Sequence, residues 1–402
     1  TLSLWSHKGI TKMTHPIVEA LQVREAEFIA LRHRFHQQPE IGFQEHKTSA
    51  EVAKLLTGWG YEVDYGLGGT GVVGTLKVGN GNATLGLRAD MDALPMQERS
   101  GKPWASETDG SFHGCGHDGH TTMLLYAAEY LARTRSFNGT LHLIFQPAEE
   151  LLYGGRVMLE DGLFTKFPCD RIFGLHNMPG QKLGKIGLRD GAMMASSDTL
   201  HIDVQGVGGH GAVPEHTVDA TVVACHITLA LQTIVSRNIS PFDPVVVTVG
   251  SIQAGHAPNI INDKVQMKLT VRTLNESVRK TVLQRIHDIA VSQAESFNAT
   301  ATLTHVNGSP VLRNDPQANQ MVREVATSLF GEASIATVNP FMGSEDFAFM
   351  LEQNPNGAYF TIGAGDEPDR CMVHNPGYDF NDNILLTGAA LWCGLTEHYL
   401  RT

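Results

Sequence analysis

The chain has 402 residues, of which 42% are hydrophobic and 18% charged, ordinary values for a globular protein. This length exceeds the range in which a single core keeps growing, so we expect two domains. The net charge of −12 argues against nucleic acid or an anionic membrane surface as partner, and we find no apolar run that predicts a membrane span. Five scattered cysteines cannot build a disulfide framework and indicate a reducing, cytoplasmic setting. Residues 1–12 lack periodicity, and we interpret them as an added leader before a natural start at Met13.

The first predicted elements are helices. Apolar residues recur at helical spacing from His15 to Gln37, and a second amphipathic helix is predicted from Lys47 to Trp59. His33 and His36 have the i,i+3 spacing that could bind a metal ion. Because no third ligand is near them in the sequence, we interpret both as part of a polar helix face.

Three buried strands in succession end in side chains of the metal-ligand type. They deliver Asp90 and Asp92, Glu149 and Glu150, and His176. Ligand sites of open α/β sheets lie at the carboxyl ends of strands, so these groups are candidates for one site. An Asx-turn could explain the two aspartates alone, but it does not explain three strand ends. Strands that alternate with helices predict a mainly parallel sheet covered on both faces.

A glycine-rich loop between the first two of these strands carries further candidates. Residues 113–120 read HGCGHDGH, and a helix is predicted directly after them, from Thr121 to Arg133. The candidate ligands from this loop, the strand ends and the C-terminal part are Cys115, His117, Glu150, His176 and His374. Thiolate, imidazole and carboxylate together suit Zn, Mn, Co or Ni, and five ligands exceed one tetrahedral site, so two divalent metal ions are predicted. Of the adjacent glutamates, one would bind metal and the other would act as a base, but residue chemistry alone does not say which.

The composition changes near Met193. Residues 194–308 show the order β-α-β-β-α-β, which is typical of a ferredoxin-like domain. We therefore predict an α/β catalytic domain made of residues 13–193 and 309–402, interrupted by this α+β insert acting as a lid or dimerisation domain.

Nine short motifs follow one another in an order that resembles one enzyme family. They read LRADMDALP, HGCGHDGH, QPAEE, GLHNMPG, AMMASSD, GGHGAVP, NIIND, MGSEDF and VHNPGYDFND. Together they resemble the dinuclear-metal amidohydrolases that include bacterial hippuricases, N-acyl amino acid amidohydrolases and plant auxin-conjugate hydrolases. This is the cysteine-containing branch of the larger aminoacylase and carboxypeptidase superfamily, and the resemblance extends from about Ile17 to the C-terminus.

The resemblance implies a role for each matching position. Cys115 would bridge the two metal ions, and the remaining ligands would be His117, Glu150, His176 and His374. In this branch the superfamily's His-x-Asp ligand pair is Asp90-Met91-Asp92, so Asp90 is not counted as a ligand. His113 is not counted either.

Other residues would act around the metal ions. Glu149 would be the general base and acid, and Asp92 would hydrogen-bond a ligand histidine. His210 of the insert resembles the histidine that stabilises the oxyanion, often from a neighbouring subunit. Asn259 and Arg272 would bind the free carboxylate of the substrate, although Arg272 could also be an ordinary exposed strand residue.

The predicted reaction is therefore hydrolysis of an N-acyl amino acid, hippurate-like or aliphatic, to a carboxylic acid and a free amino acid. A di- or tripeptidase or carboxypeptidase with the same centre is the alternative among enzymes. A non-catalytic protein that binds metal or amino acids is the alternative of another class. The predicted partners are a small N-acyl amino acid or short peptide and, in a homodimer or higher homo-oligomer, further copies of the chain.

One departure from the family pattern concerns specificity. Many relatives have glycine after the double glutamate, whereas Leu151, Leu152 and Tyr153 precede Gly154 here. We expect these larger side chains to narrow one wall of the acyl pocket.

Overall fold

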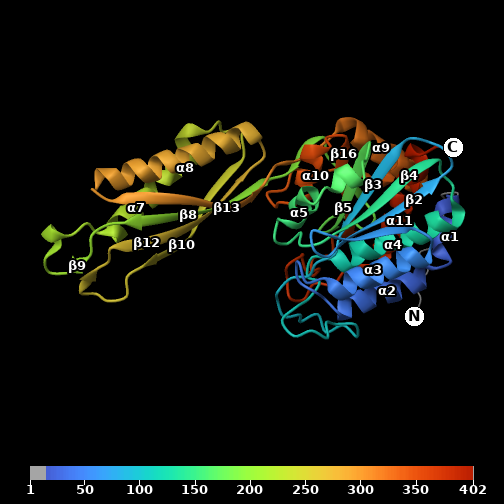
Figure 1. The fold of residues 1–402 in the computed structure, drawn as a ribbon, viewed down its shortest axis with the longest axis horizontal. Helices are drawn as coiled ribbons and strands as arrows, with labels where there is room; N and C mark the ends of the chain where they lie inside the picture. The colour runs from blue at the N-terminus through green and yellow to red at the C-terminus, as the bar shows by residue number, and fades with distance from the viewer. Residues whose placement is uncertain (1–14, 402) are drawn as a thin grey trace.

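The computed structural model describes residues 15–401, and the predicted leader lies outside them. Two parts follow one another along the longest axis of the molecule, as Figure 1 shows. The larger part contains both termini of the described chain, and the smaller part is formed by the insert. We call them the body and the insert.

The body is built on a mixed sheet. From one edge to the other, its strands are β1 (Glu62–Leu67), β2 (Gly71–Val78), β4 (Gly139–Gln146), β3 (Thr84–Asp90), β5 (Arg171–Pro179), β16 (Gly357–Gly365), β6 (Ile186–Leu188) and β15 (Ile335–Thr337). The centre from β4 to β16 is parallel, which confirms the predicted sheet, while β1 and β2 pair antiparallel at one edge. Parallel pairing follows from the crossover helices that connect these buried strands.

Helices cover both faces of this sheet. One face carries the large apolar core and the helices α3 (His46–Gly58), α4 (His117–Thr134), α9 (Pro316–Phe330) and α11 (Leu385–Tyr399), with α1 (Pro16–Gln22) and α2 (Glu25–Gln37) outside them. The other face packs a smaller core under α5 (Gly154–Glu160), α6 (Leu163–Lys166) and α10 (Phe347–Gln353). The short pair β7 (Gly191–Met194) and β14 (Leu312–Asn314) joins the body where the insert leaves and returns.

The first helix differs from its prediction. The single helix expected over residues 15–37 is broken at Val23 and Arg24, which lets α1 contact α11 while α2 contacts α4. The interpretation of His36 as part of a polar face is wrong, because this side chain is fully buried and its ring nitrogens contact the carboxylates of Asp118 (2.8 Å) and Glu98 (3.2 Å).

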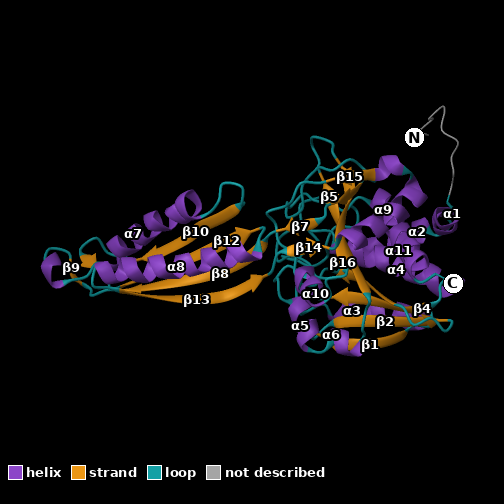
Figure 2. Cartoon of the chain, turned by 90° about the horizontal axis from the view of Figure 1, so that it is seen from above, coloured by secondary structure: helices purple, strands orange, loops and turns teal. Residues whose placement is uncertain are grey.

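The insert has its own sheet and core. Its antiparallel strands, in spatial order, are β10 (Val245–Ala254), β12 (Lys264–Thr273), β8 (Ser196–Gln205) and β13 (Thr300–Ser309). The helices α7 (Ala220–Thr233) and α8 (Glu276–Ser296) cover one face, as Figure 2 shows, and the predicted β-α-β-β-α-β order is confirmed. A small additional ribbon of β9 (Gly209–His210) and β11 (Ile260–Ile261) forms the tip farthest from the body.

The helix α7 continues as a π-helical turn to Asn238. By length and composition alone the segment Ala220–Asn238 could cross a membrane, with 33% of the window buried. Its inner face packs in the core of the insert through Val223, Ile227 and Leu231.

Candidate active site

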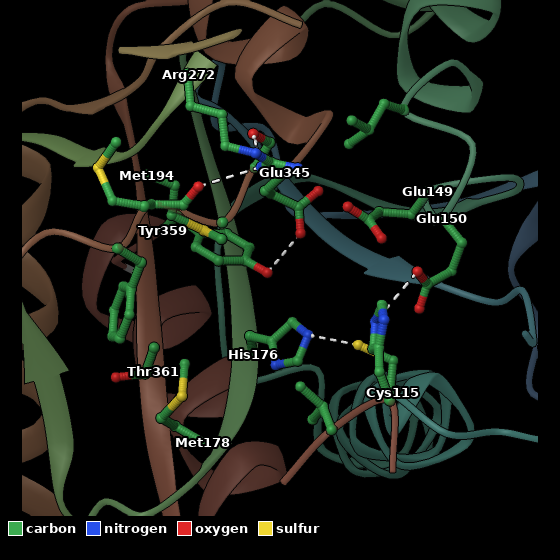
Figure 3. Close-up of a pocket in the computed structure, with 17 residues that line it drawn as sticks. Cys115, Glu149, Glu150, His176, Met178, Met194, Arg272, Glu345, Tyr359 and Thr361 are labelled. Atoms are coloured by element: carbon green, nitrogen blue, oxygen red, sulfur yellow. Dashed lines mark hydrogen bonds and ion pairs between the residues drawn. The ribbon is translucent and has the colours of Figure 1, made fainter. Parts of the chain in front are cut away.

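The candidate site lies where the central strands of the body end. A cavity of about 470 Å³ opens there, and Figure 3 shows the side chains around it. Its polar lining includes Cys115, Glu149, Glu150, His176, Arg272, Glu345, Tyr359 and His374. The strand ends therefore bring together groups that lie far apart in the sequence, as predicted from their positions.

The loop that carries Cys115 and His117 is fixed by glycine. The helix α4 begins at His117, not at Thr121 as expected, because Gly116 precedes it with a φ of 96°. A Cβ atom on Gly116 would lie 2.4 Å from Nδ2 of Asn177, so a side chain would strain the backbone and clash as well. The loop therefore turns sharply and delivers His117 from the first turn of a buried helix.

Five side chains form overlapping groups of metal-ligand type. Sγ of Cys115 lies 3.3 Å from Nε2 of His176, and Nε2 of His374 lies 3.3 Å from Oε2 of Glu150. Cys115 belongs both to a group with His117 and His176 and to a group with Glu150 and His374, and in each group the ligand atoms lie within 4.8 Å of one another. A thiolate shared by two such groups fits a bridging ligand between two metal ions.

Unsatisfied atoms support this fit. Among residues 15–401, Nε2 of His117 and Oε1 of Glu150 are buried and have no hydrogen-bond partner. Such atoms are rare in folded proteins unless an ion or water satisfies them. His374 adopts a φ of 64°, which is uncommon for a residue other than glycine and typical of strained functional sites.

The surroundings of Cys115 also call for a cation. Burial, and next the carboxylates of Glu150 and Glu149, raises the pKa of the Cys115 thiol well above its usual value. A thiolate at this position therefore needs a bound cation, which deprotonates a coordinating thiol. The donor set of sulfur, imidazole and carboxylate suits Zn, Mn, Co or Ni, and the residues present fit a two-metal centre.

Asp90 and Asp92, at the end of β3, each contact a histidine ring. Oδ1 of Asp92 lies 3.1 Å from Nδ1 of His117, and its Oδ2 accepts a hydrogen bond of 2.9 Å from the backbone N–H of Glu150. Asp92 therefore contacts the ring of His117, and its role beside a metal ligand stays a prediction. Asp90 lies 2.6 Å from Nδ1 of His120, whose Nε2 accepts the backbone N–H of Asn177 at 3.0 Å, so both ring nitrogens of His120 are occupied.

Glu149 also belongs to a group of metal-ligand type, with His117 and Glu150, but not to either group that contains Cys115. Its Oε2 lies 3.9 Å from Nε2 of His117, close enough to reach a water molecule between them. Burial, and next Glu345 and Glu150, raises the pKa of Glu149 well above its usual value. Figure 3 shows its carboxylate pointing into the cavity. A carboxylate in this setting can take up a proton and release it again.

A buried charge cluster behind the cavity was not assigned a role from the sequence. Arg88 is fully buried and contacts Asp90 (2.7 Å), Glu345 (2.8 Å) and Asp346 (3.3 Å). Glu345 and Asp346 belong to the MGSEDF motif, which was noticed only as part of the family pattern. Arg88 lies in a strand, and the two acids follow more than 250 residues later in the chain. No local sequence pattern therefore predicts that these side chains are in contact.

Residues of the insert divide into two groups. Arg272 reaches the cavity, where its Nη1 donates to the carbonyl oxygen of Met342 (3.1 Å) and to Oγ of Ser344 (2.9 Å). It is half-buried, and burial lowers the pKa of its guanidinium. His210 and Asn259 lie at the tip, where they line a separate hollow, so one chain does not bring them to the cavity.

The residues after the double glutamate differ in exposure. Leu152 lines the cavity, whereas Leu151 and Tyr153 keep 50% and 38% of their surface exposed. Of these three residues, Leu152 is the one that lines the cavity, and a narrower acyl pocket stays a prediction. The following glycine is required, because a Cβ atom on Gly154 would lie 1.7 Å from the carbonyl oxygen of Pro147.

Comparison with known proteins agrees with this site. Residues 86–398 match the model of peptidase family M20/M25/M40, and the chain belongs to this family. It is 44% identical to the hippurate hydrolase of Campylobacter jejuni over 94% of this chain and 97% of that one, and 35% identical to the N-acetyl-L-cysteine deacetylase of Bacillus subtilis over 91% and 86%. The predicted recognition is confirmed, and the chain is a hydrolase of amide bonds.

Solved structures support the fold. A crystal structure of a protein from methicillin resistant Staphylococcus aureus matches with a TM-score of 0.91 and 33% identity over 96% of this chain and 99% of that chain. A Bacillus subtilis protein described as a dinuclear metal binding peptidase from the M20 family matches with a TM-score of 0.82 and 30% identity over 95% and 99%. These likenesses make the predicted non-catalytic alternative untenable, since relatives along the whole chain are hydrolases.

Proposed function

We propose that the protein hydrolyses N-acyl amino acids to a carboxylic acid and a free amino acid. The observation that carries this proposal is the free carboxylate of Glu149, which faces the cavity beside the unsatisfied Nε2 of His117. The hippurate hydrolase, 44% identical over almost the whole chain, supports the same reaction class.

Two divalent metal ions would be held by Cys115, His117, Glu150, His176 and His374. When bound, such ions lower the pKa of a coordinated water molecule and polarise the acyl carbonyl group. Glu149 takes the proton of the attacking water and delivers it to the nitrogen as the C–N bond breaks. Asp92 holds the ring of His117 in one orientation during these steps.

The cavity has one cationic end and one apolar wall. Arg272 has no carboxylate within ion-pair distance in the described chain, so its charge is available for the carboxylate of a substrate. Met178, Met194 and Phe341 also line the cavity, and an apolar acyl group would fit against these side chains. The amide bond would then lie beside Glu149.

His210 and Asn259 would act from a second copy of the chain. They lie at the tip of the insert, away from the cavity of their own chain, so a homodimer in which each tip reaches the partner's cavity would complete both sites. The insert offers a surface for pairing. Its edge strand β10 and helix α7 expose apolar side chains, namely Val222 (45%), Leu229 (69%), Val246 (37%) and Ile252 (44%).

Initial rates on a substrate panel test the proposal. The panel contains N-benzoyl, N-acetyl and indole-acetyl amino acids and glycine-containing dipeptides, each with Mn, Zn, Co or Ni added back to the enzyme. We expect N-acyl amino acids to be cleaved faster than dipeptides. Cleavage of dipeptides without cleavage of any N-acyl amino acid would favour the alternative of a dipeptidase or carboxypeptidase and contradict the proposal.

A further inference from the structure

A second carboxylate faces Glu149 inside the cavity. Glu345 lines the cavity although only 1% of its surface is exposed. One carboxylate oxygen each of Glu149, Glu345 and Asp346 lies within 4.8 Å of the other two. Figure 3 shows the side chains of Glu149 and Glu345 directed toward each other. Both carboxylates therefore lie at the cavity in which the substrate would bind.

Glu345 cannot turn away from Glu149. Its Oε1 accepts hydrogen bonds from Arg88 (2.8 Å) and from the backbone N–H of Phe347 (2.9 Å), and its Oε2 accepts one from the hydroxyl of Tyr359 (2.6 Å). A longer hydrogen bond of 3.4 Å from Nη1 of Arg88 also reaches Oε2, and together these four bonds fix the group beside the cavity. A preorganised acceptor of this kind loses little entropy when it binds a donor.

Behind the cavity, several carboxylates share one arginine. Arg88 is the cation of the cluster, and it is shared by Asp90, Glu345 and Asp346. Carboxylates held together in a buried place repel each other and favour a positive group or a hydrogen-bond donor between them. The hydrolysis of an amide produces such a group, because the nitrogen carries a proton before cleavage and becomes an ammonium group afterwards.

The order of groups along the cavity places this nitrogen near Glu345. Ser344, the residue before Glu345, accepts a hydrogen bond from Arg272 at 2.9 Å. In an N-acyl amino acid one carbon separates the carboxylate from the nitrogen. A carboxylate bound by Arg272 therefore puts the nitrogen close to Glu345, with the acyl carbon beyond it toward Glu149.

We propose that Glu345 accepts a hydrogen bond from the N–H of the scissile amide and then from the ammonium group of the leaving amino acid. The inference rests on the proposed function and deepens it. In the step itself the C–O bond forms and the C–N bond breaks, while Glu149 carries one proton of water to the nitrogen. Glu345 keeps the leaving group in place.

The role is tested with an amide substrate and the matching ester, in which an oxygen atom replaces the N–H group. The wild type and Glu345→Gln are assayed on N-benzoylglycine and O-benzoylglycolate, or on the pair built from whichever acyl group the wild type cleaves best. We expect kcat/KM of the amide to fall by about 10- to 100-fold, the loss of one hydrogen bond to a charged group, and that of the ester to stay within about threefold. Equal losses on both substrates would show that Glu345 acts only through the structure.

Product inhibition supplies a second measurement that does not depend on turnover of the amide. With the ester as substrate, inhibition by glycine should weaken about tenfold in Glu345→Gln, while inhibition by glycolate should stay unchanged. Unchanged inhibition by glycine would contradict the proposal. A wild type that cleaves no N-acyl amino acid would instead contradict the proposed function.

Two variants control for the buried cluster. Asp346→Asn perturbs the same Arg88 but not the lining of the cavity, so we expect it to affect amide and ester equally. A selective loss of amide cleavage in Asp346→Asn would overturn the assignment to Glu345. If Glu345→Gln does not fold, Tyr359→Phe removes one hydrogen bond that fixes Glu345, and the same selectivity is expected with a smaller amplitude. Equal losses in that variant would overturn the proposal.

Discussion

The body and the insert differ in how many charged side chains they bury. The body buries two sets of charges. Arg88, Asp90, Glu345 and Asp346 lie behind its cavity, and Arg32 lies in a separate cluster with acidic side chains. Within the described residues of the insert, Asp198 is the one buried charged side chain, and it is paired with Arg279 and His305 near the body. Burying charges costs desolvation free energy, and the body bears this cost where it holds its reactive groups. The insert has an ordinary apolar core and holds His210 and Asn259 at its tip, far from the cavity of its own chain.

Removal of the metal ions should affect the body and leave the insert unchanged, and this is the largest difference that we expect between the two parts. A chelator should abolish activity, and hydrogen exchange should rise in residues 113–120 of the body but not in β12 of the insert. The reason is that bound ions stabilise only the part that holds them. Restoration by Zn, Mn, Co or Ni is the control. Full activity of a metal-free preparation would contradict the two-metal centre, and equal exchange changes in both parts would contradict their independence.

Glu149→Ala should lower kcat by about 100- to 10,000-fold, the usual contribution of a general base. Because Glu149 is not among the proposed ligands, the metal content should stay at the wild-type value. Rates and metal analysis on one preparation check both. Unchanged turnover with bound metal would remove Glu149 from the mechanism.

His210→Ala should lower kcat by about 100- to 1,000-fold, as expected for loss of an oxyanion donor. Mixing His210→Ala chains with Glu149→Ala chains should then restore activity up to about a quarter of the wild-type value, because each mixed dimer of C2 symmetry has one intact site. Refolding or long incubation of the mixture allows the exchange of subunits. Absence of recovery in verified mixed dimers would show that His210 does not act across the interface.

Arg272→Lys should raise KM by about tenfold with a smaller change in kcat, because lysine keeps the charge but loses the planar fork that matches a carboxylate. A substrate with an amidated carboxyl group is the control, since it should respond weakly to the substitution. An equal response to both substrates would contradict a contact between Arg272 and the carboxylate.

A smaller difference concerns acid stability. Burial lowers the pKa of His142, on β4 of the body, to about 4. Folding keeps this histidine neutral, so its contribution is present above the unfolded pKa near 6.5 and is lost as the pH falls toward 4. Between pH 7 and pH 5 the neutral state of His142 lowers the free energy of unfolding by about 2 kcal/mol. Denaturant unfolding of His142→Gln should show a correspondingly smaller loss, and an identical loss would contradict this account.

The sequence allowed most of the site in the body to be predicted. Strand ends can be located from periodicity, and parallel neighbours must end at one edge, so Glu149, Glu150 and His176 could be grouped without coordinates. Cys115 and His117 were found from their clustering with glycines. The start of α4 was missed because the left-handed conformation of Gly116 is set by Asn177 and Tyr378, which come from distant segments.

Other features could not be predicted because they depend on tertiary contacts. Arg88 looks like an exposed residue of a strand until Glu345 and Asp346 are folded against it. Leu151 is exposed whereas Leu152 is half-buried and lines the cavity, a difference between neighbours that composition does not predict. The boundaries proposed for the insert, residues 194–308, the homodimer and the cytoplasmic setting stay predictions.

The distance between His210 and the cavity of its own chain has a consequence for enzymology. A site completed by a second chain makes specific activity a function of protein concentration, since dilution below the dissociation constant of the dimer removes the donor from every cavity at once. Rates measured at nanomolar enzyme would then fall faster than the enzyme concentration, while the metal content per chain stays constant.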